Sequence, residues 1–157
     1  MEPAVEIDFS SRARVRLHEE FRLLSMDPPA LCSAGPDIDD WLVWQATVVA
    51  PQGSLYIGCI FHLKMTFPCS YPEVAPECRL LTNLRHMNAG GNGTIRLKIV
   101  EQWHSELTVR DLLMAIVSML VDPDPSYALD GDLAMLFKSN RPKHDQVVRE
   151  YMAKIMS

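Results

Sequence analysis

One apolar segment limits the folds open to this chain more than any other feature: L-L-M-A-I-V-S-M-L-V, residues 112–121. Thr108 is placed to cap the start of a helix, and Asp111 to stabilise its first turn. The sequence D-P-D-P at residues 122–125 ends that helix, because proline cannot donate to the backbone ladder. A helix that is apolar almost all round must be covered on nearly every side. We therefore predict a buried helix that packs across a sheet.

The same run is about half of the ~20 residues that a membrane-spanning helix needs. The first residues, M-E-P-A-V-E-I-D-F-S, are acidic, whereas a secretory signal begins with a basic segment followed by an apolar one. We expect no membrane partner. The 157 residues, 48% of them hydrophobic and 22% charged, suffice for one globular domain with a substantial core. We expect residues 1–10 to form a flexible N-terminal lead and residues 11–157 a single domain.

Four β segments are predicted ahead of the buried helix. The segments between them are rich in residues that favour turns, and their spacing is typical of an antiparallel meander. These segments are D-I-D-D, A-P-Q-G-S and F-P-C-S-Y-P-E-V-A-P. A helix that Ser10 or Ser11 caps and that runs to about Met26 precedes the strands, with Leu17, Phe21 and Leu24 on one face. The predicted strands cover residues 30–35, 42–49, 60–65 and 77–81.

Residues 84–107 show little periodicity, and a loop of that length inside a compact domain is usually functional. Two more helices are predicted beyond the D-P-D-P turn, over residues 131–139 and 143–156, because each places its apolar residues on one face. The pattern therefore predicts an α+β domain in the order α-β-β-β-β-loop-α-α-α.

The formal net charge of −5 disfavours a nonspecific nucleic-acid binder, because that function needs a basic surface. The four cysteines, Cys32, Cys59, Cys69 and Cys78, have neither C-x-x-C spacing nor a histidine at zinc-ligand spacing. We expect reduced, mostly buried thiols of a cytoplasmic or nuclear protein, in preference to a disulfide framework. Cys69 should be the most exposed of them, and no metal or cofactor is expected.

Several short motifs follow one another along the chain. They are D-P-P-A-x-C-S-A-G-P at residues 27–36, D-D-W-x-x-W-Q-A-T at 39–47, F-P-x-x-Y-P at 67–72, H-x-N at 86–88, N-G-x-I at 92–95, Q-W at 102–103 and D-P-x-P at 122–125. With them the chain, from about Arg14 to Met156, resembles a ubiquitin-conjugating enzyme domain. It is most similar to the small class that consists of little more than that domain. The resemblance implies the family's fold, which agrees with the architecture predicted above.

The family's chemistry, as the resemblance implies it, is to accept ubiquitin as a thioester on one cysteine and to pass it to a lysine, usually with a ubiquitin ligase. That cysteine follows the N-G-x-I motif, and the position here is Arg96. A guanidinium stays protonated at physiological pH and is therefore no nucleophile. We predict that the chain is a catalytically inactive variant and not an enzyme.

Two other parts of the reaction are altered in the same way. The family's His-Pro-Asn supplies an asparagine that stabilises the oxyanion; here Asn88 is present, but the middle residue is Met87. Without a thiol, we favour a structural role for His86 and Asn88, which is to hydrogen-bond the loop into shape. Tyr127 follows Ser126 where the related small enzymes carry acidic residues, and a tyrosine hydroxyl holds its proton near neutral pH and is a poor base.

Positive charge is the third change. Lys98 stands where those relatives have an acidic residue, and Arg85 and Arg96 lie close to it in the sequence. The ubiquitin tail that the family lays in this groove is itself basic. Our hypothesis is that these three added positive charges, with a bulky side chain, oppose its docking by like-charge repulsion.

Surfaces away from the cysteine position remain candidates for binding. Ser33 and Thr47 stand where many relatives hold a second, noncovalent ubiquitin, although both also fit ordinary solvent-facing strand positions. The resemblance places a ligase-docking surface on the first helix and two loop tips, where the side chains differ from those of relatives and argue against ordinary RING-type docking. Its residues here are Arg12, Arg16, Glu73, Ser105 and Glu106. The helix charges among them also fit a solvated helix face.

The sequence therefore predicts a binding or regulatory component of protein ubiquitination. Candidate partners are noncovalent ubiquitin, an active ubiquitin-conjugating enzyme, or a ubiquitin ligase complex such as a cullin-ligase adaptor. Two alternatives stay open. One is a scaffold domain that has left the ubiquitin system, and the other is a conjugating enzyme that uses a different cysteine, which would have to lie within reach of Asn88.

Overall fold

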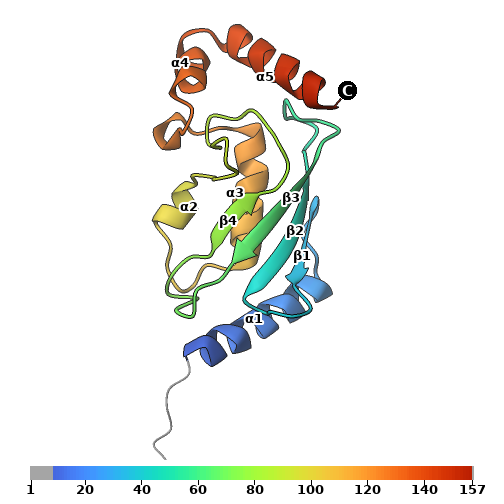
Figure 1. Cartoon of the computed structure of the whole chain (residues 1–157), viewed down its shortest axis with the longest axis vertical. Coiled ribbons are helices and arrows are strands. Elements are labelled where there is room, and N and C mark those ends of the chain that lie inside the picture. Colours follow the sequence, from blue (N-terminus) through green and yellow to red (C-terminus); the bar gives the residue numbers. More distant parts are fainter. Residues whose placement is uncertain (1–8, 157) are drawn as a thin grey trace, which may run out of the picture.

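The computed structural model describes residues 9–156, with side chains from residue 12 onward. Most of the predicted lead, residues 1–10, lies outside the described residues. The predicted α+β architecture is confirmed (Figure 1). In order, the elements are α1 (Phe9–Met26), β1 (Cys32–Pro36), β2 (Val43–Val49), β3 (Ile60–Thr66), β4 (Glu77–Leu80), α2 (Lys98–Glu101), α3 (Val109–Val121), the 3-10 helix η1 (Pro125–Tyr127), α4 (Gly131–Ser139) and α5 (Arg141–Met156).

The sheet is a four-stranded antiparallel meander in the order β1-β2-β3-β4. Strand β3 alternates strictly between exposed and buried residues, and its buried residues Phe61, Leu63 and Met65 face the core. This alternation arises because successive side chains point to opposite faces of a strand. One face of the sheet is therefore covered, and the other remains open to solvent.

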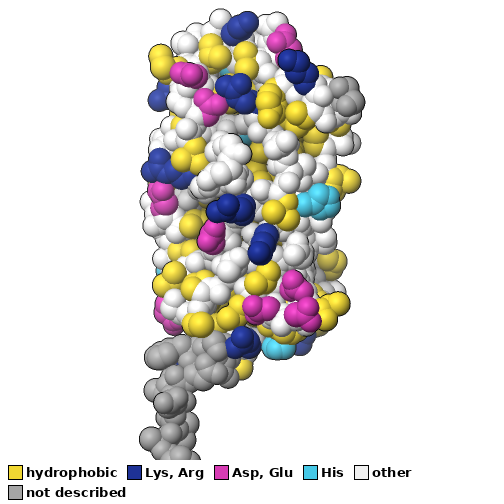
Figure 2. Space-filling view, viewed as in Figure 1, with side chains coloured by type: hydrophobic (Ala, Val, Ile, Leu, Met, Phe, Trp, Pro, Cys, Tyr) yellow, Lys and Arg dark blue, Asp and Glu magenta, His cyan; other side chains and the backbone are white. Residues whose placement is uncertain are grey.

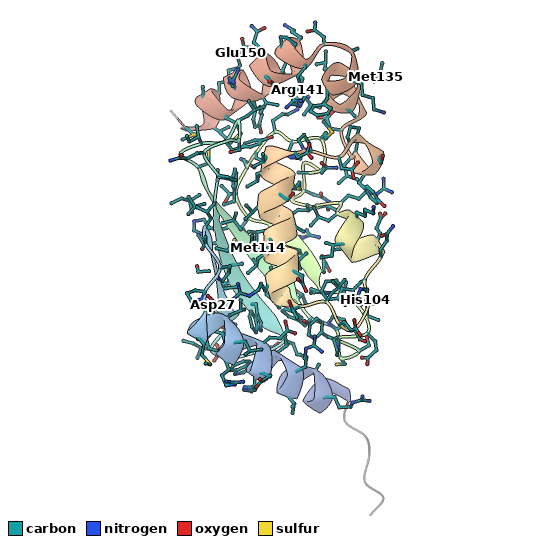
Figure 3. The ribbon with its side chains drawn as sticks, turned by 180° about the vertical axis from the view of Figure 1, so that it is seen from behind. Asp27, His104, Met114, Met135, Arg141 and Glu150 are labelled. Carbon is teal, nitrogen blue, oxygen red and sulfur yellow. The ribbon has the colours of Figure 1, made fainter. Side chains whose placement is uncertain are left out.

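Helix α3 covers the buried face. Figure 3, which views the molecule from behind, shows α3 lying across the sheet, whereas in Figure 1 the open face is toward the viewer. Thr108 and Asp111 form the predicted capping box, in which the threonine side chain accepts from the Asp111 N–H and the carboxylate accepts from the Thr108 N–H. The predicted buried helix is confirmed, with core residues Val109, Leu112, Leu113, Ile116, Met119 and Leu120.

Helix α1 closes one end of the sheet, and the α4–α5 pair lies at the other end (Figure 1). Leu17 and Leu24 of α1 are buried as predicted, and Phe21 is half-buried against Trp41 and Trp44. The helix begins at Phe9, so Ser10 and Ser11 lie inside it and not before it. The predicted position of its cap was wrong. Within residues 9–156, no helix is long and apolar enough to cross a membrane.

The long segment before α3 is more ordered than its sequence indicated. It contains the short helix α2 and two isolated bridges, which pair Arg79 with Thr94 and Ala89 with Ile95. Gly93 makes this path possible: its φ is 87°, and a Cβ there would lie 2.3 Å from the carbonyl oxygen of Leu80. Only glycine tolerates that approach. The segment is thereby fastened to the edge of the sheet.

Candidate functional site

Arg96 lies at the end of this bridged segment, immediately before α2. Its Nε donates to Oε1 of Glu101 at 2.7 Å, and its guanidinium carbon lies 5.1 Å from the centre of the Tyr127 ring. The hydrogen bond to the carboxylate raises the pKa of Arg96. The position that the resemblance assigns to a nucleophilic thiol therefore holds a permanent cation that is fixed by an acid on one edge and by an aromatic ring on its face.

Asn88 lies beneath this position and is 1% exposed. Its Nδ2 donates to the carbonyl oxygens of Asp124 and Tyr127 at 2.8 and 2.9 Å, and its Oδ1 accepts from the Asp124 N–H at 3.0 Å. Its backbone carbonyl also accepts from the Arg96 N–H at 2.9 Å. Both amide hydrogens and the amide oxygen are thus occupied by the chain itself. The side chain joins the Arg96 loop to the D-P-D-P turn, which is the structural role that we favoured.

His86 fixes the start of the same loop. Its Nδ1 accepts from the backbone N–H of Asn88 at 2.9 Å, so the ring proton must reside on Nε2, which lies 2.7 Å from the carbonyl oxygen of Met119. Burial lowers the pKa of His86 to about 4 against the opposing hydrogen bond to that carbonyl, and His144 nearby lowers it further. The imidazole is therefore neutral near pH 7, in a single tautomer.

Met87, where the family has proline, is fully buried. Its carbonyl oxygen accepts from the N–H groups of Leu129 and Asp130 at 2.6 and 3.0 Å. Trp103 holds the far end of the segment, because its Nε1 donates to the carbonyl oxygen of Pro72 at 2.8 Å. The loop is thus tied to the start of α4 and to the turn after β3.

Arg96, Asn88 and Tyr127 line a groove of about 750 Å³ between α2, α3 and the D-P-D-P turn. Lys98 and His104 also line it, as do two aspartates, Asp122 and Asp124. The structure brings together the predicted residues Asn88, Arg96 and Tyr127 at this groove; His86 and Met87 support it from below. Sequence reasoning missed the two aspartates as groove residues, although the D-P-D-P motif contains them.

The predicted electrostatic closure of this groove is wrong in part. Arg85 does not line it and pairs with Asp130 at 3.0 Å. Arg96 is compensated by Glu101, and Asp122 and Asp124 add negative charge to the wall. Like-charge repulsion by three free cations is therefore no reason for a basic tail to be excluded. The Arg96 side chain itself extends from its loop to the ring of Tyr127 on the opposite wall.

None of the four cysteines lines the groove, and all four are free thiols. Burial raises the pKa of Cys32 to about 11 and that of Cys78 to about 12, and it also raises the pKa of Cys59. A thiol with a raised pKa carries little nucleophilic thiolate near neutral pH. Cys69 is exposed, as predicted, but it lies in a different cleft beside α1.

Ser33 and Thr47 are directly paired across β1 and β2 on the open face of the sheet. Ser33 is exposed, and Thr47 is half-buried. Farther along the same face lie Val49 and Ile60, 38% and 52% exposed, which are also paired with each other. Figure 2 shows this face with basic side chains set singly among acidic and apolar ones, and with acidic side chains gathered over the β1–β2 turn. Sequence reasoning did not identify the apolar pair.

On the predicted partner surface of α1, Arg16 also makes contacts within the fold. Its Nε donates to Glu20 at 3.0 Å and its Nη2 to the carbonyl oxygen of Leu107 at 3.1 Å. The side chain is nevertheless 30% exposed and lines the cleft beside α1, so Arg16 belongs both to the internal contacts of the fold and to the predicted partner surface. Arg12 and Glu73 are exposed on a cleft of about 540 Å³ between α1 and the turn after β3.

Ser105 and Glu106 are exposed as well, on the loop that carries His104. Figure 3 shows His104 toward the α1 end of the molecule. The loop tip therefore lies at the same end as the α1 cleft.

Glu20, which sequence reasoning missed, explains the position of Arg16. It is a carboxylate only 5% exposed, and it accepts from the Arg16 guanidinium, the Tyr71 hydroxyl and the Val109 N–H. These contacts join α1, the turn after β3 and the start of α3, and the negative charge also suits a helix N-terminus. Among the described residues, no group of histidine, cysteine and acidic side chains is arranged to hold a metal ion.

Comparison with protein families gives one match. The family model described as "Ubiquitin-conjugating enzyme" matches residues 16–152, from the middle of α1 to near the end of α5. The matched region contains all four strands, the groove at Arg96 and the open face of the sheet. This chain belongs to the ubiquitin-conjugating enzyme family.

Proposed function

We propose that this chain is a non-catalytic member of its family that acts as a binding or regulatory component of protein ubiquitination. The observation that carries the proposal is Arg96, a cation paired with Glu101 and stacked on Tyr127 at the position where the family's reaction requires a thiol. Thioester formation needs a nucleophile that attacks an acyl carbon and later leaves, and a guanidinium does neither.

The hydrogen bonds of Asn88 support the same proposal. An asparagine that stabilises an oxyanion needs a donor directed at the reacting oxygen. Here both Nδ2 hydrogens are donated to the carbonyl oxygens of Asp124 and Tyr127. The residue is therefore explained by the shape of the loop, and no catalytic role is needed to account for it.

A charging assay tests the loss of catalysis. The protein is incubated with ubiquitin-activating enzyme, ubiquitin and ATP, and adducts are separated with and without reducing agent. We expect no reducible adduct on the natural chain. A reducible adduct would contradict the proposal, and peptide mapping would identify the cysteine used. That outcome would favour the alternative of a different cysteine, for which exposed Cys69 is the first candidate.

The variant Arg96→Cys then separates two causes of inactivity. Efficient charging of Arg96→Cys would show that only the nucleophile is missing. We expect poor charging, because the substitution leaves the Glu101 carboxylate unpaired and the Tyr127 ring exposed beside the new thiol. Thr94→Cys, an exposed position two residues earlier, is the matched control for adventitious acylation of a surface thiol.

The binding role that we propose rests on two surfaces. Noncovalent ubiquitin is assigned to the open face of the sheet, at Ser33 and Thr47. Titration of labelled ubiquitin, followed by NMR to about millimolar concentration, should move the amide signals of both residues. Ser33→Arg should abolish these shifts, since a long cation on a flat sheet face blocks close contact. The absence of shifts in the natural chain would remove ubiquitin from the list of partners.

A ligase subunit or an active conjugating enzyme is assigned to the cleft at Arg12 and Glu73 and to the loop tip at Ser105 and Glu106. Affinity purification of the tagged chain from cytoplasmic and nuclear extracts, where we place the protein, should recover such components, including cullin-ligase adaptors. The charge reversal Glu73→Arg should release them, whereas Glu77→Arg, outside the cleft, should not. Recovery of neither ubiquitin, conjugating enzymes nor ligase subunits would favour a scaffold that has left the ubiquitin system.

A further inference from the structure

A separate cavity of about 200 Å³ lies where the end of α3 meets the start of α5 and the loop that precedes β3. It is separate from the open face and from the α1 cleft. Arg141, labelled in Figure 3, lies where the first turn of α5 faces the end of α3. The loop contributes Leu55 and Tyr56, and the imidazoles of His86 and His144 form part of the wall.

His144 is held in this wall by its neighbour. The residue is 3% exposed, and its Nδ1 lies 2.7 Å from Oδ1 of Asp145. Burial alone would raise the pKa of Asp145, but the hydrogen bonds with His144 and Arg141 outweigh burial and lower it. The carboxylate is therefore ionised, and Nδ1 of His144 is the donor. This bond orients the ring and leaves Nε2 for another partner.

Nε2 of His144 makes no hydrogen bond within residues 9–156. Among residues 9–156, no fully enclosed side-chain nitrogen or oxygen lacks a hydrogen-bond partner. Nε2 has no partner in that part of the chain, so solvent must reach it, and the cavity that the ring lines is the route. A nine-tenths buried imidazole thus presents a free polar atom to an enclosed space, where a bound group can hydrogen-bond to it.

Two arginines give the cavity an excess of positive charge. Nε of Arg141 donates to Asp145 at 3.1 Å, and its guanidinium lies 4.2 Å from the centre of the Phe137 ring. Its two terminal nitrogens remain available. Arg149 also lines the cavity, and no carboxylate among the described residues pairs with it. Two guanidinium groups against one carboxylate leave a net charge of +1 around the space when the histidines are neutral, which favours an anion.

The rest of the wall is apolar. Leu55, Leu120, Val121 and Met87 surround the space, together with the ring of Tyr56. A cavity of about 150 Å³ accommodates a benzene molecule, so 200 Å³ admits a ring with a small charged substituent. A bare inorganic anion would leave most of this apolar surface uncovered.

We propose that this cavity binds a small organic oxyanion, with a carboxylate or phosphate head held by Arg149 and Arg141 and an apolar body about the size of a benzene ring. His144 Nε2 supplies the third polar contact. The proposal does not depend on the function proposed above, because the cavity lies apart from the surfaces assigned to ubiquitin and to ligases. Binding would stabilise the His86 side of the loop, because the ligand would contact the folded state alone.

Four probes of defined chemistry test the assignment on the full chain by NMR titration. Benzoate and phenyl phosphate carry the two possible heads on the same body, benzylamine carries the opposite charge, and inorganic phosphate lacks the body. We expect saturable shifts for benzoate or phenyl phosphate at amides of residues 53–56, 120–122 and 143–149, and the tighter of the two identifies the head. Benzylamine and inorganic phosphate should bind at least about tenfold more weakly.

Arg149→Gln is the decisive variant, because the residue is exposed and its loss leaves the fold intact. It should weaken the better probe about tenfold or more, through the loss of a charge-assisted hydrogen bond. His144→Phe, which removes Nε2 but keeps an aromatic ring, should also weaken it. Arg22→Gln, an exposed position on α1 at the far end of the molecule, should leave affinity unchanged. Equal binding by Arg149→Gln, equal binding of benzylamine, or no shifts to about 10 mM probe would overturn the proposal.

Discussion

Acidification should destabilise this protein through one buried side chain, His86. The imidazole is 3% exposed, and its two nitrogens are committed: Nδ1 accepts from the Asn88 N–H, and Nε2 donates to the Met119 carbonyl. A second proton would have to enter at Nδ1, where it would face the N–H hydrogen. Protonation therefore breaks the contact that positions Asn88, in addition to placing a charge in the core.

The magnitude follows from the two pKa values. Burial lowers the pKa of His86 to about 4 in the folded chain, whereas an unfolded chain has a value near 6.5. Between these values the unfolded state binds more protons, so stability is full above about pH 6.5 and is lost as the pH falls toward 4. The expected loss is about 1.4 kcal/mol at about pH 5.5 and about 2.5 kcal/mol at about pH 4.5. Below about pH 3 His86 adds almost no further loss.

Urea denaturation followed by tryptophan fluorescence measures this loss. Free energies of unfolding are compared at steps between about pH 7.5 and pH 4.5 for the natural chain and for His86→Gln. The glutamine cannot titrate, so the difference between the two curves isolates the imidazole from the carboxylates, which titrate in both proteins. His62→Gln removes an exposed histidine from β3 and is the matched control, expected to follow the natural chain.

Two results would refute the reasoning. In the first, the natural chain and His86→Gln lose the same free energy between about pH 7 and pH 5. In the second, the His86 ring signals titrate with a midpoint near 6.5, the value of a solvated imidazole. The NMR titration needs no substitution, so it tests the prediction even if His86→Gln folds poorly.

Three further outcomes are expected. Gly93→Ala should destabilise the chain by about 2 kcal/mol or more, because φ is 87° and the new Cβ would meet the Leu80 carbonyl; Gly91→Ala, with open space around it, should change urea stability by less than about 0.5 kcal/mol. Asn88→Ala should cost about 2–4 kcal/mol in the same assay, because it leaves the Tyr127 carbonyl and the Asp124 N–H without their partners and removes one of the two donors to the Asp124 carbonyl. In the native protein one thiol, Cys69, should react rapidly with an aromatic disulfide reagent and the other three slowly; rapid release of two or more would contradict the burial of these thiols.

The architecture could be predicted from the sequence because its strongest signals are local. The apolar run of α3 carries its own cap at Thr108 and its own stop at Pro123. The alternation in β3 requires one covered face. Helix α2 was missed for the opposite reason. It has four residues, no buried residue and no side-chain cap at Leu97, so periodicity gives no signal, and only the surrounding segment fixes it.

The groove shows how much of a site can be predicted from the sequence alone. Arg96 could be identified from its distance to the N-G-x-I motif, because that distance is a sequence property. Its pairing with Glu101 and its stacking on Tyr127 join residues 5 and 31 positions away, and Arg85 finds Asp130 at a separation of 45. The sequence therefore predicted three cations in one groove. In the fold, Arg85 and Arg96 each form an ion pair, and Lys98 is a single exposed lysine.

The same contacts bear on what holds the loop in its shape. Asn88 satisfies two carbonyl groups and one N–H of the D-P-D-P turn, and Met87 satisfies two N–H groups at the start of α4. Loss of the Asn88 side chain leaves the part-buried Tyr127 carbonyl and Asp124 N–H without these partners, at a cost of about 1–3 kcal/mol each. Such a cost is large beside the total stability of a domain. The requirements of folding alone are therefore enough to account for His86 and Asn88, and their presence is not by itself evidence of catalysis.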